Sequence, residues 1–192
     1  MELRFVALED RHLSLQPFSP ELESGVRQAL DHDHETWAIL LTPGFGPHFG
    51  AWWAAALADA EAGRRQPYAV VLQATGEVVG TSSFIDIRPR DRAVEIGSTF
   101  YRPDVRGGVV NPACKRLMMA HAFACGAGRV QFKVDARNRR SQGAVTRLGA
   151  QREGALRKTQ ITWTGWRRDT VYFSVLDDEW PEVCAGLDAR LD

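Results

Sequence analysis

Residues 100–115 read FYRPDVRGGVVNPACK and carry the strongest local signal in the chain. An apolar strand ends here, Gly107 and Gly108 let the chain turn, and a helix is predicted to begin at Asn111. Asn111 is a favoured helix cap, and Pro112 follows at a position where a missing amide proton costs nothing. The pattern predicts a strand, a glycine turn and a helix start whose backbone amides face outward.

This corner has the properties of an anion-binding site. The amides of residues 107–111 lie at the positive end of the predicted helix dipole, and Arg106 and Lys115 add positive charge on either side. Neither GxxxxGK[ST] nor GxGxxG is present, so the nucleotide-binding loops that carry those motifs are not indicated. The pattern favours a diphosphate ligand, and the alternative is an ordinary, well-capped turn between a strand and a helix.

Residues 134–149, VDARNRRSQGAVTRLG, form a second strand-to-helix junction. The strand predicted for residues 129–135 alternates apolar and polar side chains without a break. Asn138 is predicted to cap the next helix, and Ser141 lies in its first turn. Both are expected near the carboxyl end of the strand, where open sheets bind ligands, although simple capping is the alternative role.

The rest of the chain reads as one mixed arrangement of strands and helices. Strands are predicted at 3–8, 12–18, 68–73, 77–87, 93–101, 129–135, 160–163 and 169–176, and helices at 20–30, 49–62, 111–125, 138–148 and from 178 onward. No linker divides the chain, so residues 1–192 are predicted to be a single domain of the α+β (mixed α/β) class with helices on both faces of a sheet.

Composition excludes several classes of protein. Hydrophobic residues are 44% and charged residues 25%, as in ordinary globular proteins. Three cysteines without CxxC spacing argue against a disulfide framework or a zinc site and favour a cytoplasmic location. No apolar run of about 18 residues and no signal-peptide pattern is found, so no membrane association is expected.

Charge is distributed unevenly, although the net charge is zero. Residues 1–100 hold 8 Lys and Arg against 14 Asp and Glu, whereas residues 102–168 hold 15 against 3. Such a basic segment faces a phosphorylated ligand, a nucleic acid or the acidic first half of the chain. Aromatic residues are sparse among the basic ones, so nucleic acid is the weaker interpretation.

Taken together, these stretches resemble the GNAT superfamily of N-acetyltransferases, and they are most similar to its RimJ/RimL-like branch, which acetylates protein N-terminal amines. The similarity is carried by VEIGSTFYRPDVRGGVVNPACKRLMMAHAFACG, RVQFKVDARNRRSQGAVTRLGAQREGALRK and RRDTVYFSVLDDEWP, within residues 94–181. It implies a twisted, mostly antiparallel sheet whose central parallel strands, residues 93–101 and 129–135, splay apart around acetyl-CoA. A homodimer is a further expectation, because the family often forms dimers.

The resemblance assigns the glycine turn to the diphosphate of acetyl-CoA. Arg106 and Gly107 fit the superfamily pattern Gln/Arg-x-x-Gly-x-Gly/Ala, whereas Val109 and Asn111 replace its small residues. An Asn-x-x-Ser motif beginning at Asn138 matches the branch and lies beside the pantetheine arm in that family. The residues expected to contact the cofactor are Phe100, Arg106, Gly107, Gly108, Val109, Val110, Asn111, Lys115, Asn138 and Ser141.

The implied reaction is direct attack of a primary amine on a thioester. An α-amine with a pKa of about 7.7–8.0 is partly neutral near pH 7, whereas a lysine amine near 10.4 needs a stronger base. Glu95 is the expected base, since an apolar cleft raises the pKa of a carboxyl group, and its alternative role is a salt bridge to an arginine. Ser141 is expected to protonate the thiolate, and backbone amides near residues 98–100 to hold the acetyl oxygen.

Other chemistry is only weakly indicated. The cluster DHDHE at 31–35 has metal-binding side chains, but no HExxH motif is completed and no metal is expected. A protein N-terminus and a small-molecule amine are both compatible acceptors, and the acidic first half favours a cationic one. A non-catalytic acyl-CoA sensor on the same fold and a nucleic-acid-binding module are the alternative functions.

Overall fold

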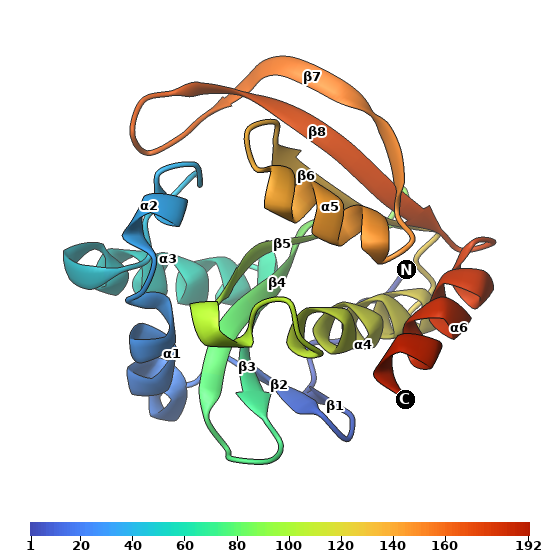
Figure 1. Cartoon of the computed structure of the whole chain (residues 1–192), viewed down its shortest axis with the longest axis horizontal. Coiled ribbons are helices and arrows are strands. Elements are labelled where there is room, and N and C mark those ends of the chain that lie inside the picture. The colour runs from blue at the N-terminus through green and yellow to red at the C-terminus, as the bar shows by residue number, and fades with distance from the viewer.

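The structure is a computed structural model that describes residues 1–192. Its eight strands form one sheet in the order β1-β2-β3-β4-β5-β6-β8-β7. Neighbouring strands run antiparallel except β5 and β6, which pair in parallel. Helices cover both faces of the sheet, so the fold class predicted from the sequence is confirmed (Figure 1).

The element bounds are as follows. The strands are β1 (Leu8–Glu9), β2 (Leu13–Pro17), β3 (Arg65–Leu72), β4 (Val78–Arg88), β5 (Ala93–Tyr101), β6 (Arg129–Asp135), β7 (Gln151–Ile161) and β8 (Arg167–Leu176). The helices are α1 (Glu23–Leu30), α2 (His34–Trp37), α3 (Phe49–Glu61), α4 (Val110–Ala124), α5 (Arg139–Arg147) and α6 (Trp180–Leu191). None of these helices is both long enough and apolar enough to cross a membrane.

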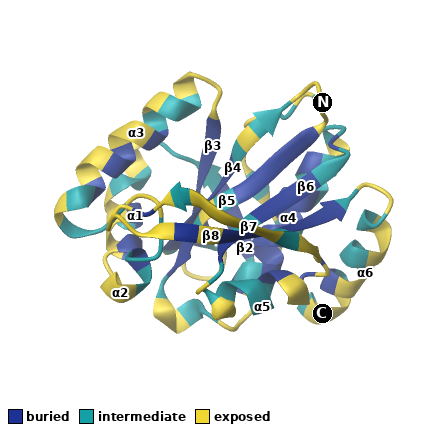
Figure 2. Cartoon of the chain, turned by 90° about the horizontal axis from the view of Figure 1, so that it is seen from above, coloured by how far each residue is buried: buried dark blue, intermediate teal, exposed yellow.

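Two apolar clusters fill the space between the sheet and its helices. The larger joins α4 and α6 to the apolar side chains of β6, among them Phe132, as the alternation of that strand predicted. The smaller joins α1 and α3 to β3 and includes Trp52 and Phe100. Strands β4, β5 and β6 are therefore largely buried, whereas β7 is mostly exposed at the edge of the sheet (Figure 2).

The parallel contact between β5 and β6 is short. Its register runs from Ala93 opposite Arg129 only to Glu95 opposite Gln131, and beyond this point the two strands no longer pair with each other. This separation is the splayed pair that the family resemblance implied, and it opens toward the carboxyl ends of both strands.

A β-bulge distorts β5 immediately after the strands part. Thr81 of β4 lies opposite Phe100, whereas Ser83 lies opposite Gly97, so β5 carries one extra residue. Ser98 within the bulge has a φ of +46°, in the left-handed region that side chains other than glycine seldom occupy. The bulge turns part of the β5 backbone away from regular pairing with β4.

Three local predictions were wrong. Of the predicted strand 3–8 only Leu8 pairs in the sheet, as the first residue of β1. The predicted helix 20–30 is divided into a 3₁₀ turn over Pro20–Leu22 and α1. The late hairpin is longer than expected, because β7 begins at Gln151 rather than at residue 160.

Asn111 does not cap α4, contrary to the prediction. The helix begins at Val110, and the first helical hydrogen bond runs from the Ala113 amide to the Val109 carbonyl at 3.0 Å. Val109 therefore occupies the cap position, and Asn111 lies within the first turn. Since no side chain caps this helix, the amides of its first turn remain available to solvent or to a ligand.

Candidate active site

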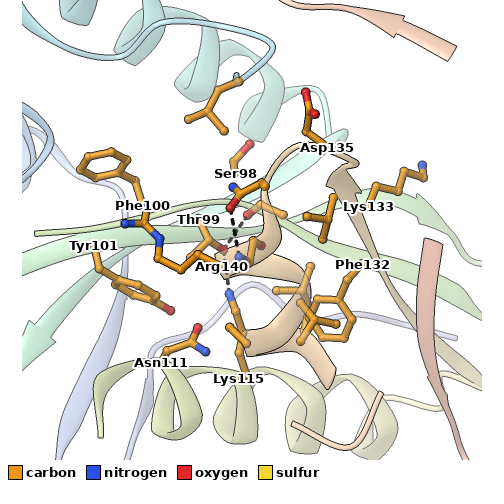
Figure 3. A pocket seen from close by; sticks show the side chains of 18 of the residues that line it. Ser98, Thr99, Phe100, Tyr101, Asn111, Lys115, Phe132, Lys133, Asp135 and Arg140 are labelled. Carbon is orange, nitrogen blue, oxygen red and sulfur yellow. Dashed lines mark hydrogen bonds between the residues drawn. The ribbon is translucent and has the colours of Figure 1, made fainter. Parts of the chain in front are cut away.

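A cavity of about 790 Å³ lies where β5 and β6 separate. Its walls come from the splayed strands, the start of α4, the first turns of α5 and the segment that follows α2 (Figure 3). All of the predicted site residues line it except Val109, which is 44% exposed, and Val110, which is buried in the core. The structure thus brings together residues that are as much as 46 positions apart in sequence, from Glu95 to Ser141.

The glycine turn forms one end of this cavity. Gly107 has a φ of +81°, and a Cβ atom added to it would meet nothing within 4 Å. Gly108 is similarly open, with its nearest neighbour, the Val105 carbonyl, at 3.7 Å from such an atom. The turn therefore needs glycine for its conformation, and it leaves the main chain open to close approach by another molecule.

Arg106 is held by protein groups on this wall. Its Nε donates to the Tyr101 carbonyl at 2.8 Å, and its Nη1 forms an ion pair with Asp33, the residue just before α2. Burial opposes the charged form of Asp33, but hydrogen bonds from Thr36 and Arg106 hold the pKa of this carboxyl below its ordinary value. Arg106 therefore connects the glycine turn to a segment 73 residues earlier in the chain.

Lys115 makes hydrogen bonds that the sequence did not indicate. Its side chain runs from α4 to the bulge of β5, where Nζ donates to Ser82 Oγ and to Thr99 Oγ1, both at 2.7 Å. Figure 3 shows Lys115 beside Thr99 in the cavity. The residue is only 4% exposed, and no carboxylate lies within 4 Å of its ammonium group. Burial lowers the pKa of Lys115.

Glu95 lines the cavity from β5 and is 6% exposed. Its carboxylate is paired with Lys133 of β6 at 2.7 Å, whereas the alternative considered from the sequence was a salt bridge to an arginine. Burial raises the pKa of Glu95 above its ordinary value, although Lys133 acts in the opposite direction. Lys133 also donates to Asp86 at 3.0 Å, so two carboxylates share one ammonium group.

The start of α5 borders the same cavity. Asn138 caps the helix, since its Oδ1 accepts a hydrogen bond from the Ser141 amide at 3.0 Å, as predicted. This bond uses the main chain of Ser141 and leaves its hydroxyl free to face the cavity. Asp135, at the end of β6, is bound to the Arg137 side chain at 2.8 Å and to its amide at 2.8 Å.

Aromatic residues from distant segments close the other side of the site. Trp37 of α2 stacks on Phe100, with ring centroids 4.6 Å apart and an interplanar angle of 17°. Trp163, between β7 and β8, donates from Nε1 to the Trp37 carbonyl at 2.8 Å. The tip of the late hairpin and the α2 segment therefore meet above the splayed strands.

The acidic and histidine cluster at 31–35 has other partners. His34 contacts Asp31 at 3.0 Å, and Asp33 binds Arg106. The structure contains no group of three or more His, Cys, Asp or Glu side chains arranged to hold a metal ion.

Comparison with known families decides how this arrangement is classified. The family model described as Acetyltransferase (GNAT) domain matches residues 12–151. The chain belongs to the GNAT acetyltransferase family. It is accordingly an acyltransferase, as expected from the resemblance. None of the curated proteins matches its sequence.

Solved structures of other GNAT proteins have the same fold. A protein from T. thermophilus assigned as an acetyltransferase has 35% identity and a TM-score of 0.89, with 100% of each chain covered. A GCN5-related N-acetyltransferase from Brucella melitensis has 27% identity and a TM-score of 0.89, covering 98% of this chain and 86% of its own. Mycobacterium smegmatis RimJ in complex with CoA-disulfide has 20% identity and a TM-score of 0.79, covering 95% and 92%. At that identity, RimJ supports the fold alone.

Several residues of the acetyltransferase site were not found from the sequence. Lys133 was assigned only to the polar face of its strand, and Asp33 only to a possible metal cluster. Their partners Glu95 and Arg106 lie 38 and 73 positions away, so no local spacing reveals either contact. Ser82 carried no signal at all, because a single serine in a strand is ordinary.

Proposed function

We propose that this acetyltransferase transfers the acetyl group of acetyl-CoA directly to a primary amine, in the manner of the RimJ/RimL-like branch. A protein N-terminal amine and a small-molecule amine are the two acceptor classes. The proposal is carried by one observation: a single cavity joins the open glycine turn to the buried Glu95 through the gap between β5 and β6. Two solved structures with this fold contain such a ligand: Mycobacterium smegmatis RimJ is in complex with CoA-disulfide, and the microcin C7 self-immunity acetyltransferase MccE is in complex with acetyl-CoA and AMP.

In this proposal the diphosphate of acetyl-CoA binds at the start of α4. The open turn at Gly107 and Gly108 and the uncapped amides that follow suit an anion at a helix N-terminus. Val109 and Val110 would take part through their backbone amides, since their side chains do not line the cavity. Arg106 is already paired with Asp33, so it would bind the diphosphate either together with Asp33 or in place of it.

The pantetheine arm would then run between the splayed strands, past Phe100 and Asn138, toward the bulge. The amine nitrogen attacks the thioester carbon, a C–N bond forms, and the C–S bond breaks with its electron pair on sulfur. Glu95 accepts the proton that the amine loses, and the Ser141 hydroxyl donates a proton to the departing thiolate. Glu95 then releases its proton to water and Ser141 regains one from water, so both side chains return to their starting state. Backbone amides near Ser98 would stabilise the oxyanion.

The deciding experiment combines purified protein, acetyl-CoA and a panel of amines. The panel contains peptides with free N-termini, amino acids, polyamines and drugs that carry a primary amine. Both thiol release and acetylated products are measured. We expect thiol release that depends on one class of amine, with a product heavier by one acetyl group. Calorimetric CoA binding without turnover on any amine indicates an acyl-CoA sensor, and tight, salt-dependent RNA binding without CoA binding indicates a nucleic-acid module.

The proposal treats residues 1–192 as one cytoplasmic acetyltransferase domain that forms a homodimer. Limited proteolysis checks the domain, since one domain is expected to resist cleavage between residues 60 and 150. Sedimentation equilibrium of the same sample checks the dimer, and a concentration-independent monomer would remove that part of the proposal.

A further inference from the structure

Lys115 connects three elements at the point where the sheet opens. It extends from α4 and donates to Ser82 of β4 and Thr99 of β5, whose hydroxyl oxygens are themselves 2.9 Å apart. The three polar groups form a closed triangle that spans the β4–β5 pair. An ammonium group has three N–H donors, and only two of them have partners in the protein.

The charge of Lys115 is unusual for a group this deeply buried. The chain contains two other lysines: Lys133 is paired with two carboxylates, and Lys158 is exposed. Lys115 has no carboxylate partner, and removing an ammonium group from water without one is costly. A methionine would fill similar space without that penalty, so stability alone does not explain a lysine here.

The two acceptors of Lys115 flank the strained part of β5. Ser82 lies opposite the extra residue of the bulge, and Thr99 directly follows Ser98, whose φ is +46°. A left-handed conformation at a residue other than glycine persists only where its surroundings hold it. Ser98 and Thr99 both line the cavity, beside the gap between β5 and β6.

We propose that Lys115 is a positioning residue for acetyl transfer, which fixes the bulge at Ser98 through its bonds to Ser82 and Thr99 and so aims the bulge amides at the thioester. The inference rests on the proposed function. It assigns Lys115 to the reacting end of the substrate instead of to the diphosphate. Lys115 also lines the cavity, together with Ser98 and Thr99.

The test compares Lys115→Met with Thr99→Val, which keeps the side-chain shape but removes the hydroxyl, and with Lys158→Met as the matched control. We expect Lys115→Met and Thr99→Val each to lower kcat by about 10- to 100-fold, since the strain held at one such residue corresponds to that range. Calorimetry is expected to give an unchanged Kd for CoA. The double variant is expected to be no slower than Lys115→Met alone, because both changes break the same connection.

A second measurement follows the bulge itself. Hydrogen exchange of the peptide spanning residues 95–101 is expected to be about tenfold faster in Lys115→Met and Thr99→Val, with α6 unaffected. Lys158→Met is expected to match the wild type in exchange and in kcat. The melting temperature of Lys115→Met is expected to be no lower than that of the wild type, since the change removes a buried charge.

Three results would overturn the inference. One is a Kd for CoA weakened about tenfold in Lys115→Met with kcat unchanged, which would make Lys115 a diphosphate contact. Another is unchanged exchange over residues 95–101 in both variants. The third applies if Lys115→Met does not fold: it is a normal kcat and normal hydrogen exchange over residues 95–101 in Thr99→Val. Wild-type inactivity on every amine would instead reject the proposed function, while the exchange measurement would still test the connection.

Discussion

The pKa values of Glu95 and Lys133 are both raised, but for different reasons. For Glu95 the cost of burying a charge outweighs the attraction of Lys133, so the protonated carboxyl is favoured. For Lys133 burial acts to lower the pKa, but hydrogen bonds and charges from Glu95 and Asp86 outweigh it. Glu95 is thus a stronger base than an exposed glutamate, and Lys133 limits how far its pKa rises.

This pair gives the reaction a defined pH dependence. The carboxylate of Glu95 is lost as the pH falls through its raised pKa, so kcat/KM is expected to fall on the acidic side. Glu95→Gln is expected to lower kcat/KM by about 100-fold between the raised pKa of Glu95 and the pKa of the amine, and by less near pH 8, where an α-amine is already partly neutral. Lys133→Met removes a positive charge and is expected to shift the acidic limb to higher pH.

Both changes are read from kcat/KM measured across the pH range with a single amine. An unchanged profile in Glu95→Gln would show that Glu95 is not the base. A limb that moves to lower pH in Lys133→Met would contradict the sign of the interaction between the two groups.

Ser141 offers a test at the leaving group. Because its amide and not its hydroxyl binds Asn138, Ser141→Ala keeps the helix cap and removes only the proton donor. We expect kcat to fall by about tenfold or more with an unchanged Kd for CoA, as for loss of a general acid. Normal turnover in this variant would limit Ser141 to its role in the first turn of α5.

For single residues, the sequence predicted which side chains line the cavity better than it predicted which residues those side chains contact. Asn138 and Ser141 were placed at the cavity because they lie at a recognisable helix start, and Glu95 because it is a carboxylate on a strand expected to line an apolar cleft. For Lys115 the sequence indicated only a positive charge beside the glycine turn, because the residue lies close to that turn along α4. Only the fold shows that the side chain reaches Ser82 and Thr99, 33 and 16 positions away.

Among the elements, α5 shows how a short helix is held at the site. It has nine residues and one fully buried side chain, Val145, so little packing stabilises it. Its start depends on the cap from Asn138 and places Ser141 at the cavity. The integrity of this first turn therefore matters to both stability and chemistry.

Asn138→Ala removes the cap and is expected to destabilise the protein by about 1 kcal/mol, or roughly 2–4 °C in Tm for a chain of this length. Asn138→Ser retains a capping oxygen and serves as the control, with a Tm close to that of the wild type. Differential scanning calorimetry measures both variants. Equal losses of Tm in both would show that the cap is not what stabilises α5.

The elements differ in how clearly the sequence revealed them. Strands β5 and β6 were predicted with their observed bounds, because β6 alternates strictly and both end at clear turn or cap signals. The first part of β7 was missed because it is an edge strand exposed on both faces, so burial imposes no alternation. The start of α4 was misplaced by one residue, since a favoured capping residue at Asn111 outweighed the preceding valines.

On the scale of the whole molecule, the site is assembled from segments that are remote in sequence. The tip of the β7–β8 hairpin reaches the α2 segment through Trp163, and Thr164 adds a bond to the Ala38 carbonyl at 3.3 Å. The splayed strands and the glycine turn lie below this contact. In the proposed function the glycine turn bounds the cofactor side of the cavity, and we expect the amine side to lie toward the contact between Trp37 and Trp163.

Trp163→Phe separates these two sides experimentally. The change keeps an aromatic ring beside Phe45 but removes the donor to the Trp37 carbonyl. Losing one such bond is expected to raise KM for the amine by about fivefold while leaving the Kd for CoA unchanged. Trp166→Phe, on the same hairpin, is the control and is expected to match the wild type.

Steady-state kinetics with varied amine and calorimetry with CoA measure the two sides separately. Weaker CoA binding with a normal KM for the amine would assign Trp163 to the cofactor side instead.

Because the parallel contact of β5 and β6 ends at Glu95 and Gln131, each strand has one unpaired side beyond this point, and these two sides face each other inside the molecule. The backbone amides and carbonyls on these facing sides have no neighbouring strand. Without a ligand they are expected to form hydrogen bonds with water. A ligand with amide groups of its own would displace this water and hydrogen-bond to both strands, as an added strand does. We therefore expect the backbone on either side of this gap to be more mobile in the ligand-free protein than in the protein with a ligand bound.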